Sequence, residues 1–140
     1  MTPALYLIDT SGLFRIFQSG LRDAWSDQLA AGVIAVCPLV ELEFLYSARS
    51  LADRLDKQRL MHELLGWVPM HDGACERSQQ VQQLLTENGT HRSAGAVDLL
   101  IAATAEHHRL TVLCEDRDYL AVAAVTGQPV RLLTGDSRLS

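Results

Sequence analysis

The stretch ALYLIDTSG, residues 4–12, indicates how the chain begins to fold. Residues 4–8 form an apolar run without alternation, which is typical of a parallel strand buried on both faces. The run ends at Asp9, and a helical pattern follows over residues 11–18, for which Ser11 is a candidate N-cap. Asp9 could itself cap this helix, or it could be the first ligand of a metal site.

Short apolar runs alternate with helical patterns along the rest of the chain. Further strands are expected at 33–36, 67–70, 111–114 and 130–133. Helices are expected at 22–31, 39–49, 50–66, 74–88, 96–108 and 117–127. This alternation indicates βαβ units, and therefore an α/β fold whose parallel sheet has helices on both faces. In such sheets, ligands bind at the carboxyl ends of the strands.

The composition is that of a globular protein, with 140 residues of which 48% are hydrophobic and 21% charged. This length fits one domain over residues 1–140. No apolar run reaches the roughly 20 residues of a membrane span and no signal segment opens the chain, so we expect a cytoplasmic protein. The net charge of −5 excludes a general basic surface for nucleic acid, so any such recognition must be local.

Acidic residues stand where this sheet would bind a ligand. Asp9 follows the first strand, and Asp116 and Asp118 follow the strand at 111–114. Asp98 interrupts an apolar helix, where an unpaired charge is costly, so we expect it to have a partner. The alternative for Asp98 is a first-turn aspartate favoured by the helix dipole. Either Asp116 or Asp118 is expected in the site, and the other could cap the next helix.

Glu41 and Glu43 offer one more acid, from the helix after the second strand. They lie roughly 200° apart around the helix axis, so only one can face the site. Three or four carboxylates gathered together cannot all stay ionised without compensation, which either protonation or a divalent cation supplies. Mg²⁺ and Mn²⁺ prefer oxygen ligands, and such an ion can activate water and stabilise a phosphodiester during displacement. The pattern therefore favours phosphoryl chemistry over zinc hydrolysis.

Four stretches carry a further signal: YLIDTSG (6–12), ELEFLYSAR (41–49), HRSAGAVDLLIAATAEHH (91–108) and VLCEDRDY (112–119). Together they resemble the PIN-domain ribonucleases of the VapC toxin type, from bacterial type II toxin–antitoxin pairs. The resemblance implies a three-layer α/β/α PIN-like domain with a mostly parallel sheet of about five strands. It also implies Mg²⁺- or Mn²⁺-dependent endonuclease cleavage of RNA, a cognate VapB-like antitoxin and a homodimer.

Matched position by position, the resemblance also implies the site residues. The catalytic acids would be Asp9, Glu43, Asp98 and Asp116. Those expected to hold the metal are Asp9, Asp98 and Asp116. Glu43 is preferred to Glu41 because the family's helix motif matches EFLYSA, in which Ser47 replaces a glycine. The residues expected around the acids, as hydrogen-bond partners or substrate contacts, are Thr10, Ser11, Arg92 and Asp118.

The alternative from another class is a non-catalytic PIN-like scaffold that binds RNA or protein. All four acid positions are filled, which favours an enzyme. A haloacid-dehalogenase-like phosphatase requires a second aspartate two residues after the first, where Ser11 stands. A phospho-receiver domain requires a lysine near its last strand, whereas the one lysine of this chain, Lys57, falls in a middle helix.

Overall fold

The computed structural model describes residues 3–18, 21–134 and 137–138, which form a six-stranded sheet in the order β3-β2-β1-β4-β5-β6. The strands are β1 (Tyr6–Ile8), β2 (Ile34–Val36), β3 (Gly66–Trp67), β4 (Thr111–Cys114), β5 (Val130–Leu132) and β6 (Ser137–Arg138). The first five are parallel and β6 pairs antiparallel with β5. The predicted five parallel strands are confirmed, with β3 at an edge. The sequence does not predict β6, which is two residues long.

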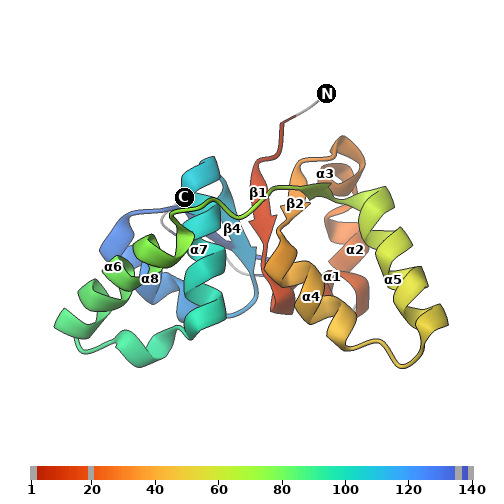
Figure 1. Cartoon of the computed structure of the whole chain (residues 1–140). Helices are drawn as coiled ribbons and strands as arrows, with labels where there is room; N and C mark the ends of the chain where they lie inside the picture. Colours follow the sequence, from red (N-terminus) through yellow and green to blue (C-terminus); the bar gives the residue numbers. More distant parts are fainter. Residues whose placement is uncertain (1–2, 19–20, 135–136, 139–140) are drawn as a thin grey trace.

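Helices cover both faces of this sheet and make the predicted three-layer arrangement (Figure 1). On one face lie α1 (Thr10–Gln18), α2 (Leu21–Ala24), α3 (Ser26–Ala31), α4 (Pro38–Tyr46) and α5 (Leu51–Leu64). On the other lie α6 (Ala74–Glu87), the 3₁₀ turn η1 (His91–Ser93), α7 (Ala96–His108) and α8 (Asp118–Thr126). Among the helices of the described residues, none combines the length and hydrophobicity needed to cross a lipid bilayer.

Helix ends follow the expected local chemistry, with one exception. Gly32 closes α3 in the left-handed region with φ 73°, and Ser50 Oγ accepts the Asp53 N–H at 3.1 Å at the start of α5. The single helix expected at 22–31 is instead two short helices, separated at Trp25. The break lies in the backbone of Trp25, whose φ of −109° and ψ of 13° depart from helical values. Its side chain is 4% exposed, and the indole N–H donates to the Leu133 carbonyl at 3.3 Å.

The strand order places a topological switch between β1 and β4. From β1 the chain builds outward to β2 and β3, and it then returns to add β4 and β5 on the other side of β1. The segments that follow β1 and β4 therefore leave toward opposite faces, which is where open α/β sheets bind ligands. Asp9 follows β1, and its N–H donates to the Leu113 carbonyl of β4 at 3.0 Å. Asp116 follows β4, so both acids stand at the switch.

Candidate metal centre

Asp9 is a buried acid, 4% exposed, at the N-terminus of α1. Its Oδ1 accepts the N–H of Gly12 at 2.8 Å, and its backbone carbonyl accepts the N–H of Leu13 at 2.9 Å. The prediction that Ser11 caps this helix is wrong, because α1 begins one residue earlier and Asp9 is the cap. Ser11 Oγ instead donates to Asp9 Oδ2 at 2.9 Å. Capping therefore fixes the orientation of Asp9 at the end of its strand.

Gly12 permits the close approach of α1 to this carboxylate. A Cβ atom at position 12 would lie 2.9 Å from Asp9 Oδ1 and 3.1 Å from the Leu113 carbonyl oxygen. The first distance is too short for a Cβ contact, so either α1 or the carboxylate would have to move. Gly12 is not among the predicted site residues. Its signal in the sequence is a glycine in the first turn of a helix, where glycine is otherwise unfavourable.

Asp98 lies in the first turn of α7 and is partly buried. The phenol of Tyr119 donates to Asp98 Oδ1 at 3.2 Å. Burial raises the pKa of Asp98, and the negative charges of Asp116 and Glu43 raise it further, while the hydrogen bond from Tyr119 opposes this. The expected partner of Asp98 is thus a buried tyrosine that the sequence patterns do not single out. Its signal is a phenol in an apolar helix, which needs a partner when buried.

The two glutamates of α4 have different partners. Thr10 Oγ1 donates a hydrogen bond to Oε1 of Glu43. Burial is the main cause of the raised pKa of Asp98, and the charge of Glu43 contributes to it as well. The Trp67 indole N–H donates to Glu41 Oε1 at 2.7 Å, beside the edge strand β3. The structure therefore brings Glu43, rather than Glu41, to the other acids.

Asp116 and Asp118 also have different surroundings. Asp116 Oδ1 accepts the N–H of Asp118 at 2.9 Å, at the start of α8. Burial raises the pKa of Asp9 to about 6, with repulsion from Asp98 and Asp116 adding to it. Burial also raises the pKa of Asp118, and the negative charge of Asp116 raises it further. The charge of Asp116 thus acts on Asp9, Asp98 and Asp118.

Arg92 lies exposed in η1, which packs against α6 and α8. It precedes α7, whose first turn holds Asp98. The expected contact of Arg92 with an RNA phosphate stays a prediction.

The donor set of this site fits a hard divalent cation. Its ligand atoms are carboxylate oxygens, which Mg²⁺ and Mn²⁺ prefer. Burial raises the pKa of Asp9 and Asp98 most, neighbouring acids add to it, and a bound cation offsets both effects. Within the described residues, no three His, Cys, Asp or Glu side chains converge closely enough to enclose an ion alone. Mg²⁺ keeps several waters and requires only one or two carboxylates. The arrangement therefore suits an ion held partly through water.

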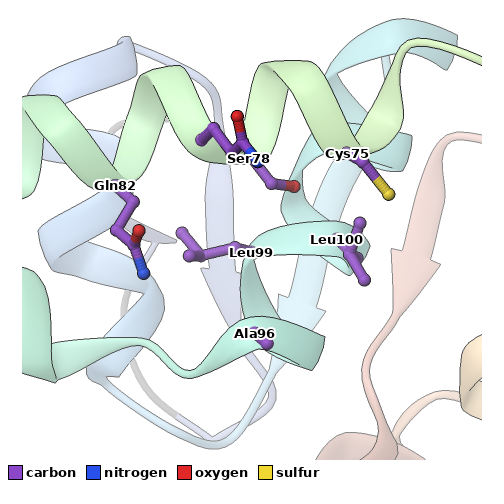
Figure 2. Close-up of a pocket in the computed structure, with 7 residues that line it drawn as sticks. Cys75, Ser78, Gln82, Ala96, Leu99 and Leu100 are labelled. Carbon is purple, nitrogen blue, oxygen red and sulfur yellow. The ribbon is translucent and has the colours of Figure 1, made fainter.

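A groove lies between α6 and α7 (Figure 2). It is lined by Cys75, Ser78, Gln79, Gln82, Ala96, Leu99 and Leu100. This lining includes none of the four acids.

The sequence model of the PIN domain matches residues 6–125. The chain belongs to the PIN domain family. Among similar PIN proteins, Ribonuclease VapC21 of Mycobacterium tuberculosis is 37% identical over 125 residues, covering 89% of this chain and 91% of that protein. Ribonuclease VapC2 of the same species is 36% identical over 137 residues, covering 96% of each. The predicted family is thus confirmed.

Solved structures share the PIN fold. DNA-bound VapBC from Salmonella typhimurium matches with a TM-score of 0.73 at 20% identity, covering 93% of this chain and 98% of that one. VapBC2 from Rickettsia felis, bound to a DNA fragment from its promoter, matches with a TM-score of 0.74 at 15% identity, covering 91% and 98%. These structures confirm the predicted three-layer fold.

Proposed function

We propose that this PIN-domain protein is a metal-dependent endoribonuclease and the toxin of a type II toxin–antitoxin pair. The observation that carries the proposal is that Asp9 and Asp116 follow the neighbouring strands β1 and β4, while the charges of Asp98 and Asp116 act on Asp9 and that of Glu43 acts on Asp98. The names of the ribonuclease relatives support RNA as the substrate. The VapBC assemblies among the structural relatives support a VapB-like antitoxin as the partner.

In this proposal Asp9, Asp98 and Asp116 hold Mg²⁺ or Mn²⁺ partly through water. When bound, an ion of this kind activates water for attack on phosphorus and stabilises the charge that develops on the phosphodiester oxygens. The remaining work is orientation. The Gly12 N–H fixes one oxygen of Asp9, and the Tyr119 phenol fixes Asp98. Each acid therefore stays in place while the substrate enters.

Glu43 completes the site from the helix layer that holds α1 and α4. Its side chain is exposed and accepts a hydrogen bond from Thr10. An exposed carboxylate at this position can accept a proton from the attacking water, which is the role of a general base. The same acids would attract a basic segment of the antitoxin. We also expect the chain to form a homodimer.

The experiment is cleavage of a fluorescent single-stranded RNA by the purified full chain, with Mn²⁺ or Mg²⁺ and with EDTA. Asp9→Asn, Asp98→Asn and Glu43→Gln should each reduce metal-dependent cleavage about a hundredfold or more. The matched control is Glu41→Gln, which changes the same residue type on the same helix but contacts Trp67, and it should cleave like the wild type.

Two outcomes would contradict the proposal. A wild-type protein without metal-dependent cleavage would be a scaffold instead of an enzyme. Cleavage that persists in both Asp9→Asn and Asp98→Asn would belong to a contaminating nuclease.

A further inference from the structure

Tyr46, the last residue of α4, presents its side chain to solvent beside the acids. It is 92% exposed, and Leu42, one helical turn earlier, is 63% exposed. These two residues line one hollow together with Glu43 and Thr10. Thr10 follows Asp9 in the chain and donates to Glu43. An aromatic ring and an aliphatic side chain thus extend the candidate metal centre on its Glu43 side.

Packing of the fold does not account for Tyr46. Its neighbour Phe44 points into the core at 3% exposure, and the Phe44 ring lies 5.0 Å from that of Phe14. The helix therefore sends one aromatic ring into the core and places another in water. A tyrosine so exposed gains almost no burial on folding, whereas it gains burial when a ligand covers it.

The acidity of this chain restricts what that ligand contact can be. With a net charge of −5 and carboxylates beside the hollow, phosphates gain little attraction there away from a bound cation. Stacking of a base on an aromatic ring does not depend on charge, and it holds single-stranded RNA regardless of sequence. We propose, on the basis of the ribonuclease function proposed above, that Tyr46 positions the RNA by stacking on a base next to the cleaved phosphodiester.

The test measures KM and kcat for cleavage of a single-stranded RNA oligonucleotide with Mn²⁺. Tyr46→Ala should raise KM about five- to a hundredfold, because each stacked base contributes that much to binding. It should leave kcat and the melting temperature unchanged. Tyr46→Phe and Tyr46→Trp keep a ring and should keep the wild-type KM. The matched control, Leu51→Ala, removes an apolar side chain that is 71% exposed on α5 and should also have no effect.

Abasic nucleotides identify the contact directly. The base at each position around the mapped cleavage site is removed in turn. Removal of the base at one position should raise the KM of the wild type to the KM of Tyr46→Ala. The same abasic RNA should not raise the KM of Tyr46→Ala any further, because that variant has already lost the stacking contact.

Three results would overturn the inference. The first is a Tyr46→Ala protein that cleaves with the wild-type KM. The second is additive effects of Tyr46→Ala at every abasic position. The third is an unchanged KM with weakened binding of the cognate antitoxin, which would assign the hollow to a protein. A wild type that does not cleave would reject the proposed function instead, so the two failures are distinguishable.

Discussion

The Tyr119 phenol lies 3.2 Å from Oδ1 of Asp98, so a side chain of α8 holds an acid of α7. Tyr119 is 1% exposed, and this burial raises the pKa of its phenol above the ordinary value. The negative charges of Asp9 and Asp98 raise it further. The phenol therefore stays protonated and can only donate toward the carboxylate. Because this hydrogen bond favours the ionised form of Asp98, it keeps that acid available to a cation.

Tyr119→Phe should raise the pKa of Asp98, because it removes the hydrogen bond that lowers it. A higher pH is then required to ionise Asp98, so the acid limb of the cleavage profile should move to higher pH. Cleavage should therefore fall more at pH 6 than at pH 8. The buried ring remains, so the cost in stability should be about 1 kcal/mol. A pH profile of kcat/KM checks the shift, and an unmoved acid limb would show that Tyr119 serves packing alone.

Asp9→Asn should stabilise the metal-free protein, although it reduces cleavage. The pKa of Asp9 is raised from the ordinary value of 3.8, which applies to the unfolded chain, to about 6 in the folded state. Between these two pH values the folded state therefore holds a proton that the unfolded state has lost. Folding stability is therefore lost as pH rises from about 4 to about 6, by roughly 2–3 kcal/mol. Asparagine carries no charge and is a favourable N-cap that can still accept the Gly12 N–H.

Urea unfolding in EDTA measures this difference. At pH 7.5 the Asp9→Asn protein should be more stable than the wild type by about 2 kcal/mol, and the difference should vanish near pH 4, where the wild-type carboxyl is protonated. Equal stability of the two proteins at pH 7.5 would show that ionised Asp9 is not destabilising.

The sequence could predict those parts of the site whose positions depend on strand ends. Asp9 and Asp116 follow apolar runs, and parallel strands place their carboxyl ends at one edge. The choice between Glu41 and Glu43 depends on the partners Trp67 and Thr10, which tertiary packing brings to α4. Periodicity alone cannot provide those partners, so only the resemblance to a family favoured Glu43.

Helix starts and buried hydroxyl groups were harder to predict for a related reason. Ser11 and Asp9 are both good N-cap residues, and the choice between them depends on the Asp9 N–H, which is bonded to Leu113 of β4. Tyr119 stands in an apolar stretch that predicts burial, but the stretch does not indicate where the phenol points. Both features are fixed by neighbours that are distant in the sequence.

Gly12→Ala should destabilise the protein, although alanine is the better helix former. The added methyl group would lie 2.9 Å from Asp9 Oδ1, so either α1 or the carboxylate must move. Overpacking of this kind costs about 1–3 kcal/mol. Gly66→Ala is the control, because its nearest contact would be an ordinary 3.7 Å. Thermal unfolding compares the two variants, and a Gly12→Ala protein as stable as Gly66→Ala would contradict the predicted clash.

Mn²⁺ should stabilise the wild type against heat, because a cation that binds the folded site shifts the unfolding equilibrium. At a hundred times its dissociation constant a ligand contributes about 2.7 kcal/mol, which corresponds to roughly 6–10 °C for a chain of this size. The shift should be small in Asp98→Asn and retained in Glu41→Gln, whose side chain contacts Trp67. It should also grow between pH 5 and pH 7.5, since the carboxyl of Asp9, with its pKa of about 6, must lose its proton to bind the ion. A shift of equal size in Asp98→Asn, or one that does not change over this pH range, would place the ion elsewhere on the protein.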